Sequence, residues 1–290
     1  MRISRYNITT ILLLLLPGMG LYLWLVLNPV LQSLVLSTYK WDTLSTKHFV
    51  GLANYKSVFA SSLFWQSLKN SLIFMVATTV FQVLIGFTLG YFVYLQMKGY
   101  RLYKTIFFLP TILPSVAVGF IWDHIYSTSM GMFKPLIEAM GMVYHNPLAS
   151  SKTAIVAVIL AQIWASCGVQ VIIFHSGFMH MPSDIIESAM LDGCSGFKLI
   201  RHAVIPLSWD ITKMVIILQI VGSLRAFDLV YVMTGGGPVH ATEVLPLHLF
   251  VNAFMNFNLG YGNVIAVIIF LLAMSMTLIM RRIMYRDSLN

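Results

Sequence analysis

Residues 181–210 read MPSDIIESAMLDGCSGFKLIRHAVIPLSWD, the longest polar, helix-forming interruption in a chain that is otherwise strongly apolar. Asp184 and Glu187 have the spacing of an N-cap residue and its N3 partner, and Gly193 can adopt the left-handed conformation that ends a helix. We therefore predict a short helix from Asp184 to Gly193, in which Glu187 is either a capping residue or a contact residue. This segment is the part of the chain best suited to meet a soluble partner.

A second short helix is predicted to begin near Ser195. Its apolar face would carry Phe197, Ile200 and Val204, with basic side chains on another face. Pro206 is expected to end this helix, because proline lacks the backbone N–H that an α-helix needs.

The composition predicts an all-α integral membrane protein. The chain has 290 residues, of which 58% are apolar and 10% are charged, and its mean hydropathy is +0.83. Soluble domains carry roughly a quarter charged residues, whereas a membrane-spanning helix needs about 20 apolar ones. Cys167 and Cys194 form no disulfide framework or metal motif. The net charge of +8 lies at the ends of apolar runs, which indicates membrane topology and argues against nucleic-acid binding.

Six apolar runs are long enough to cross the bilayer, at about residues 8–30, 72–95, 105–126, 153–174, 211–233 and 263–280. The first is expected to be retained, because it is too long for a signal peptide. Gly86 and Gly90 form a G-x-x-x-G in the second run, which either lets another helix approach closely or is a chance pairing. Pro110 and Pro114 break the third run, which indicates a backbone that faces a pathway or, alternatively, a simple kink.

Lys and Arg residues are distributed unequally over the two sides of such a six-span chain. They gather at residues 2–5, 98–104, 198–201 and 281–286, all on the side of the two termini. The richer side is cytoplasmic by the positive-inside rule. Both termini and the segment 181–210, which joins the fourth and fifth spans, are therefore predicted to be cytoplasmic.

The segment 181–210 resembles the EAA loop of ABC-importer permeases. The resemblance rests on Glu-Ser-Ala at 187–189, Asp-Gly at 192–193 and Ile-Pro-Leu at 205–207, and it departs from the pattern at Ser188 and Cys194, where Ala is usual, and at Asp210, where Pro is common. In that family the loop is a coupling helix that docks in a groove of the cytoplasmic ATPase subunit. The resemblance implies that the coupling residues are Glu187, Ser188, Ala189, Asp192, Gly193, Ile205 and Pro206.

Most of the remaining chain is similar to the carbohydrate-type, maltose-permease-like branch of that family. Gly-Leu-Ala-Asn-Tyr at 51–55, Leu-Pro at 109–110 and Met-Thr-Gly-Gly-Gly-Pro at 233–238 carry this similarity, while Lys134 stands where the branch has Asn. The resemblance implies a non-enzymatic importer subunit for a sugar or oligosaccharide, in the inner membrane of a bacterium or archaeon. It also implies a second homologous permease, two ATPase subunits and an extracytoplasmic sugar-binding protein as partners.

Cofactors are expected on the partners and not on this chain. The resemblance implies that ATP and Mg bind to the ATPase subunits. The glycines at 235–237 do not continue into Gly-Lys-Ser/Thr, and Gly-Lys occurs nowhere in the sequence, so no phosphate-binding loop is predicted. No metal site and no catalytic residue are expected either.

A sugar pocket needs amides or hydroxyls together with an aromatic surface on which a ring can stack. Arg225 and Asp228, three residues apart, could also meet on one helical face and pair beside the pathway. The glutamines could instead tie helices together. The candidate pathway residues are Gln162, Trp164, Gln170, Gln219, Arg225, Phe227, Asp228 and Tyr231.

Two other classes of protein are alternatives to an importer subunit. A secondary transporter or channel, not coupled to ATP, would show inverted repeats or several intramembrane acids, but only Asp123 and Asp228 lie in predicted spans. An intramembrane enzyme would need a motif such as His-Glu-x-x-His or paired catalytic carboxylates, and the sequence has neither.

Overall fold

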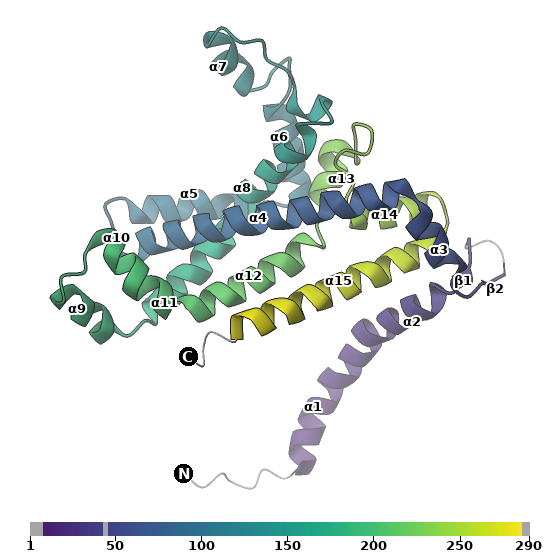
Figure 1. Ribbon diagram of the computed structural model, residues 1–290, viewed down its shortest axis with the longest axis horizontal. Coiled ribbons are helices and arrows are strands. Elements are labelled where there is room, and N and C mark those ends of the chain that lie inside the picture. Colours follow the sequence, from purple (N-terminus) through teal and green to yellow (C-terminus); the bar gives the residue numbers. More distant parts are fainter. Residues whose placement is uncertain (1–7, 43–45, 286–290) are drawn as a thin grey trace. The chain divides into compact units, whose positions relative to one another are not determined.

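The computed structural model describes residues 8–42 and 46–285, and these are mostly helical (Figure 1). The chain divides into two compact units, which comprise residues 1–61 with 248–270 and residues 62–247 with 271–290. Helices α14 (Leu245–Phe250) and α15 (Leu259–Tyr285) each contribute residues to both units.

The first unit begins with a long apolar helix, which is followed by two short strands and a further helix. The helix consists of α1 (Ile8–Tyr22), the π-helical turn η1 (Leu23–Leu27) and α2 (Asn28–Leu36). Two short antiparallel strands, β1 (Tyr39–Lys40) and β2 (His48–Phe49), follow, then α3 (Ala53–Ala60); the unit also holds η4 (Val251–Met255).

The Gly-Leu-Ala-Asn-Tyr stretch has a structural role in this unit. Asn54 Nδ2 donates hydrogen bonds to the carbonyls of Ser37 and Tyr39, at 2.8 and 2.9 Å, and the hydroxyls of Ser37 and Tyr55 lie 2.9 Å apart. A Cβ at Gly260 would lie 2.2 Å from the Tyr39 carbonyl oxygen, so the start of α15 packs directly on the same turn. These contacts satisfy backbone groups that the chain reversal after α2 would otherwise leave unpaired.

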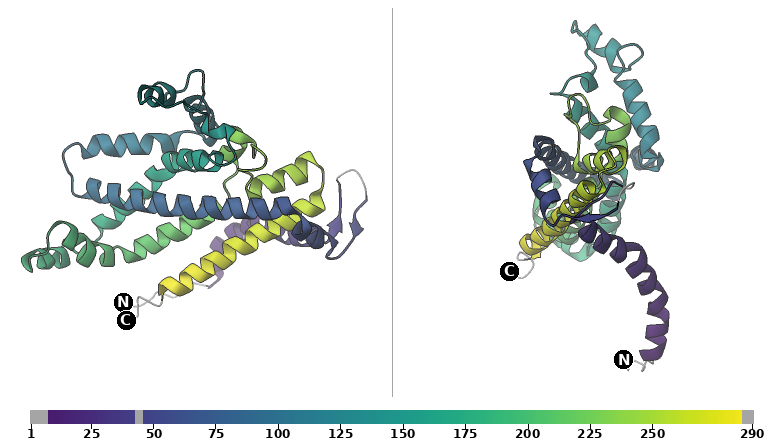
Figure 2. Two further views of the ribbon diagram at one scale, coloured as in Figure 1. Left: turned by 45° about the horizontal axis from the view of Figure 1, so that its top comes forward. Right: turned by 90° about the vertical axis from the view of Figure 1, so that its right-hand side faces the viewer.

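The second unit holds the long helices that position the candidate site. Its elements are α4 (Ser62–Tyr94), α5 (Tyr100–Ile112), α6 (Ser115–Ile125), α7 (Phe133–Ala139), η2 (Pro147–Ala149), α8 (Ala154–Met179), α9 (Ser183–Leu191), α10 (Gly196–Leu199), η3 (Ile200–Val204), α11 (Ile205–Leu207), α12 (Trp209–Ser223) and α13 (Asp228–Thr234). Helix α8 packs against both α4 and α5, and α4 also packs against α12 (Figure 2).

The closest approach in this unit joins α4 to α8. A Cβ at Gly86 would lie 2.5 Å from Gln170 Cβ, and one at Gly90 would lie 2.8 Å from Phe174 Cβ. The prediction that this G-x-x-x-G lets another helix approach closely is therefore confirmed. Next to this contact, Phe174 and Phe178 are fully buried and meet the ring of Phe87 edge-on, which gives the unit an aromatic core.

Within residues 8–42 and 46–285, four helices are long and apolar enough to cross a membrane, and up to six spans result if each of two bent pairs counts as one. One bent pair is α5 with α6, at 105°, where Pro110 lies inside α5 and Pro114 is the N-cap of α6. The break in the helix that the two prolines predict is thus present, whereas its crossing of the membrane stays a prediction. The other pair bends by 71° at Ser208, between the helix Gly196–Leu207 and α12.

The predicted fifth run at 211–233 is not one helix. Helix α12 ends at Ser223 and α13 begins at Asp228, with a non-helical connection between them. Phe227, with φ −129° and ψ −57°, lies outside helical geometry. The sequence carries no clear sign of this break, because residues 224–227 contain neither Gly nor Pro.

Candidate functional site

The polar segment forms a short helix that ends in a Schellman motif. Helix α9 runs from Ser183 to Leu191, and Gly193 follows with φ +83°. The Cys194 N–H donates to the Ala189 carbonyl at 2.9 Å, and the Gly193 N–H donates to the Met190 carbonyl at 3.0 Å. These two bonds satisfy carbonyls that the end of a helix leaves open. The predicted left-handed stop at Gly193 is confirmed.

The start of α9 differs from the predicted capping pair. Pro182 is the N-cap, with φ −61°, and no side chain caps the helix; Ser183 Oγ instead donates to Asp184 Oδ1 at 3.2 Å. The fixed φ of proline lets the helix begin directly after it. A capping box would also need a backbone N–H at the N-cap, which Pro182 lacks. Glu187 is therefore an exposed residue of α9 rather than a cap.

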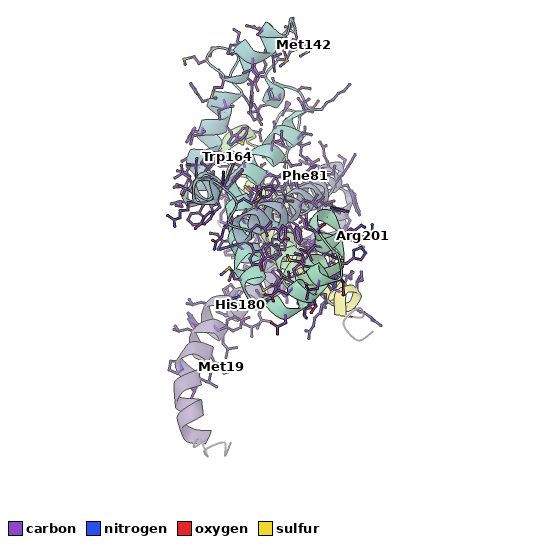
Figure 3. All side chains as sticks on the ribbon, turned by 90° about the vertical axis from the view of Figure 1, so that its left-hand side faces the viewer. Met19, Phe81, Met142, Trp164, His180 and Arg201 are labelled. Carbon is purple, nitrogen blue, oxygen red and sulfur yellow. The ribbon has the colours of Figure 1, made fainter. Side chains whose placement is uncertain are left out.

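The loop from α9 to α11 has a small core of its own and an exposed apolar surface. Ile186, Leu199 and Ala203 are buried together, with Ala189 and Cys194 packed against them. Facing outward, Leu191 is 89% exposed and Phe197 is 74% exposed, and Met190 and Ile185 are about half exposed. Figure 3 labels His180, just before α9, and Arg201, in η3. Such an apolar surface on a polar loop is typical of an interaction site.

The sequence pattern predicted that Phe197 and Val204 share one apolar face of the helix, but the structure does not place them on a common buried face. Val204 is buried, but Phe197 is exposed. The reason is the π-helical turn η3, which widens the helix just before Pro206 and shifts every later side chain away from a 3.6-residue period. The helix ends at Leu207, one residue after Pro206.

The loop joins α12 through a tightly bonded corner. Ser208 is fully buried at the bend, its Oγ donates to the Ile205 carbonyl at 3.2 Å, and its carbonyl accepts from Thr212 Oγ1 at 3.0 Å. Directly after it, Lys213 Nζ lies 3.0 Å from Asp210 Oδ1. Asp210, where the EAA pattern commonly has Pro, thus holds an ion pair with a largely buried lysine.

All three candidate glutamines make side-chain hydrogen bonds within the chain. Gln170 Nε2 donates to Gln219 Oε1 at 2.7 Å, and both residues are buried, so this bond joins α8 to α12. Gln162 Nε2 donates to Ser166 Oγ at 2.9 Å, and the backbone carbonyl of Gln162 accepts from Gln82 Nε2 at 3.1 Å. These contacts favour the helix-tie interpretation for Gln170 and Gln219.

The aromatic candidates are more accessible than the glutamines. Trp164 is 37% exposed and Tyr231 is 40% exposed, and the rings of Phe227 and Tyr231 stack with centroids 5.3 Å apart and an interplanar angle of 15°. Trp164 meets Trp122 edge-on at 5.8 Å, and Trp164 is labelled in Figure 3. These rings are carried by α6, α8 and α13, and α13 packs against both of the other two helices.

Arg225 and Asp228 do not pair as predicted. Arg225 lies in the break after α12 and Asp228 begins α13, so the two residues are not on one helical face. Among the residues that the structure describes, no ion pair joins them. Both side chains are exposed.

A comparison with protein families matches residues 82–286 to the binding-protein-dependent transport system inner membrane component. The chain belongs to this family. The probable ABC transporter permease protein PH1215 of Pyrococcus horikoshii is 31% identical over 271 residues, which cover 92% of this chain and 93% of the relative. The trehalose/maltose transport system permease protein MalF of Thermococcus litoralis is 28% identical over 268 residues, covering 92% and 90%.

The fold of the permease is also that of a solved importer. It matches a chain of a bacterial alginate ABC transporter, crystallised with an alginate pentasaccharide-bound periplasmic protein, with a TM-score of 0.85 and 17% identity over 96% of this chain and 94% of the other. Membership in the family, together with its relatives, makes the chain a transport subunit of an importer, so the interpretation as a secondary transporter or channel is set aside.

Sequence reasoning missed the polar side chains of α4 that hold the turn after α13. In this permease, Asn70 Nδ2 donates to the carbonyls of His240 and Glu243, at 3.2 and 3.0 Å, and Ser71 Oγ accepts from the Leu245 N–H at 2.7 Å. Ser67, Asn70 and Ser71 lie at i, i+3 and i+4, and this polar stripe at the start of α4 was the available signal. The segment that follows the Thr-Gly-Gly-Gly-Pro stretch is thus anchored on α4.

The amide bridge between α8 and α12 predicts a measurable stability effect. In Gln219→Met the Gln170 amide loses its partner while it stays buried, which costs about 1–3 kcal/mol. We expect a lower melting temperature for the detergent-purified permease complex, and partial recovery in Gln170→Met/Gln219→Met, because both polar groups are then removed. Gln162→Met, which removes only a bond within α8, is the control. Equal melting temperatures for all four proteins would show that the bridge contributes nothing.

Proposed function

We propose that this permease imports a sugar or oligosaccharide with energy supplied by ATP hydrolysis on separate subunits. The observation that carries the proposal is helix α9, which ends in a Schellman motif and exposes Glu187 and Leu191. Membership in a binding-protein-dependent family supports it. Relatives named for trehalose and maltose and for multiple sugars support the substrate class.

The proposed complex contains a second homologous permease, two ATPase subunits and an extracytoplasmic sugar-binding protein. The ATPase subunits bind ATP and Mg, and this chain binds neither. Six spans place both termini and the α9–α11 loop on the cytoplasmic side of the cell membrane of a bacterium or archaeon, as the positive-inside rule requires. The solved neighbour, with its periplasmic protein, supports an extracytoplasmic partner.

Coupling is assigned to the α9–α11 loop and its corner. The ATPase groove receives the exposed surface of α9, and the Schellman motif fixes the angle at which the chain leaves it. The residues assigned are Glu187, Ser188, Ala189, Asp192, Gly193, Ile205 and Pro206. Movement of this loop reaches α12 through the bonded corner at Ser208 and the Asp210–Lys213 ion pair.

The substrate surface is assigned to the accessible aromatic rings Trp164, Phe227 and Tyr231. Sugar rings have apolar faces that stack on such rings, and the polar groups near them, Gln162, Arg225 and Asp228, can bond to hydroxyls. Gln170 and Gln219 hold the helices on which these residues sit.

The coupling proposal is tested at Gly193. Gly193→Val puts a β-branched residue at φ +83°, which costs about 1 kcal/mol or more, and distorts the end of α9. We expect sugar uptake to fall while basal ATP hydrolysis by the complex persists, and Glu187→Ala to act in the same direction. Gly141→Val is the matched control, because Gly141 has φ +75° and open space around it. It lies within residues 127–152, the outer loop predicted between the third and fourth spans, on the side opposite the termini. Normal uptake in both Gly193→Val and Glu187→Ala would remove the coupling role.

The substrate surface is tested by truncating its stacked pair. Phe227→Ala and Tyr231→Ala should each raise the KM for uptake about five- to tenfold, since an aromatic contact is worth about 1 kcal/mol. Assembly and basal ATP hydrolysis should stay unchanged. Phe81→Ala, at a ring that is 53% exposed on α4, is the control. If both variants weaken assembly and leave KM unaltered, the rings are structural and the pocket lies in the partner permease.

A further inference from the structure

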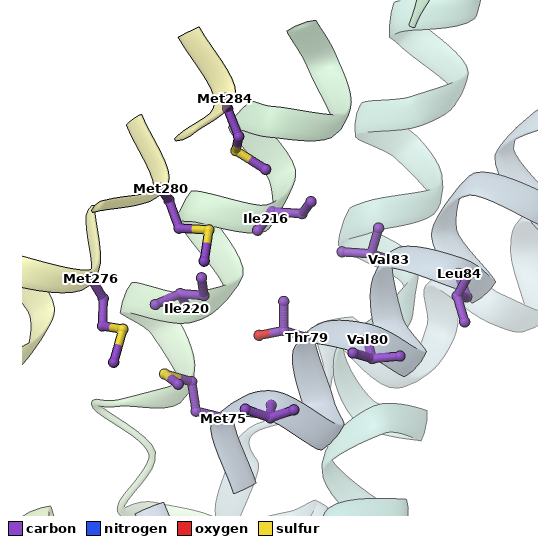
Figure 4. Close-up of a pocket in the computed structure, with 11 residues that line it drawn as sticks. Met75, Thr79, Val80, Val83, Leu84, Ile216, Ile220, Met276, Met280 and Met284 are labelled. Carbon is purple, nitrogen blue, oxygen red and sulfur yellow. The ribbon is translucent and has the colours of Figure 1, made fainter. Parts of the chain in front are cut away.

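A deep apolar groove lies between α4, α12 and α15, apart from the coupling and substrate residues (Figure 4). Its volume is about 450 Å³. Of the eleven lining residues only Thr79 is polar, and four are methionines. All of them belong to one compact unit. A groove lined almost entirely by apolar side chains suits an apolar occupant.

The groove has a buried floor and an exposed rim. Met75 and Ile220 are nearly fully buried, at 5% and 6% exposure, whereas Val80 and Leu84 on the rim are about half exposed. Met276, Met280 and Met284 recur every fourth residue along α15 and line one wall. Their side chains point into the groove in Figure 4. Methionine has flexible, unbranched side chains, which suits a mobile and irregular occupant.

The dimensions fit one lipid tail. Along α15 the wall from Met276 to Met284 is about 12 Å long, at 1.5 Å per residue. One leaflet contributes about half of the roughly 30 Å hydrocarbon core. A methylene is about the size of a water molecule, whose share of liquid volume is about 30 Å³, so the groove holds about fifteen of them. A partner's spanning helix, about 10 Å across, could insert only a few side chains.

The charge at one end of the groove indicates what the tail is attached to. Arg281 directly follows Met280 on α15 and is exposed, whereas Arg282, four residues after Leu278, lies on the opposite face of the helix. On α12, Lys213 lies on the same face as the lining residues Ile216 and Ile220, one turn before them, where it pairs with Asp210. Basic residues beside grooves between spanning helices on the cytoplasmic side attract anionic lipid headgroups.

We propose that the groove binds one acyl chain of an anionic phospholipid from the cytoplasmic leaflet, with its headgroup phosphate at Arg281. The leaflet assignment rests on the proposed function, because it uses the same orientation. The lipid fills the space between α12, which carries the coupling corner, and α15. Its binding thereby stabilises the packing of the helix that follows the coupling loop.

The experiment measures lipid retained by the assembled importer. The complex is equilibrated with vesicles of equal parts phosphatidylglycerol and phosphatidylcholine, extracted in mild detergent and analysed by native mass spectrometry. We expect Met280→Trp, which fills the groove, to lower bound phosphatidylglycerol at least fivefold. Leu278→Trp, at an exposed position on the opposite face of α15, should leave it unchanged. Arg281→Gln should lower the preference for phosphatidylglycerol over phosphatidylcholine at least fivefold, whereas Arg282→Gln, on the opposite face of α15, should leave it unchanged.

A photoreactive residue at Val80, on the rim, gives a second readout that does not depend on filling the groove. An adduct with the mass of phosphatidylglycerol supports the proposal, whereas an adduct with the second permease, or with phosphatidylcholine as often as phosphatidylglycerol, overturns it. Unchanged lipid retention in Met280→Trp also overturns it. These readouts involve no transport, so a failure of the sugar or coupling assignment would appear separately, in uptake and ATP hydrolysis.

Discussion

The packing of α4 on α8 through Gly86 and Gly90 is the contact on which the second unit depends. A Cβ at either position would lie within 3 Å of Gln170 or Phe174, so only glycine allows the two backbones to come this close. That approach places Gln170 where it can bond to Gln219 on α12, and it brings Phe174 into the aromatic core. In hydrocarbon, close packing and interhelical hydrogen bonds supply the association that hydrophobic burial supplies in water. The candidate pathway residues on α8 and α13 take their positions from this frame.

The α9–α11 loop differs from the packed helices of the second unit, because local hydrogen bonds define its shape. The Schellman motif at Gly193 ends α9, and the π-helical turn η3 precedes Pro206. The hydrogen bonds of Ser208 hold the 71° bend between the loop and α12. The loop buries Ile186, Leu199 and Ala203 against one another and leaves Leu191 and Phe197 outward. A segment that is stiff inside and apolar outside is suited to transmit a force applied to its surface. The same helix α12 then forms one wall of the groove assigned to a lipid tail.

Much of this arrangement could be predicted from the sequence, because its determinants are local. Apolar runs reveal long helices, Gly193 reveals a left-handed stop, and Gly86 with Gly90 reveals close packing. Where the structure differs from the sequence prediction, a particular residue or turn explains the difference. Asp184 looked like a cap, but Pro182 can start the helix and removes the N–H that a capping box needs. Phe197 was placed inward because a 3.6-residue period cannot anticipate the π-helical turn η3. The Arg225–Asp228 pair failed because the break at 224–227 carries no Gly or Pro signal, and the role of Asn70 depends on a turn some 170 residues away.

The central claim is that the outward face of α9 meets a cytoplasmic ATPase subunit. The most direct measurement is photocrosslinking in intact membranes from Leu191, the most exposed apolar residue of the loop, compared with Met142, which is 55% exposed in the predicted outer loop. The account predicts that Leu191 forms an adduct with the ATPase subunit and that Met142 forms none with it. An adduct of Leu191 with extracytoplasmic protein, or the absence of any ATPase adduct while the ATPase is bound to the complex, would contradict the account.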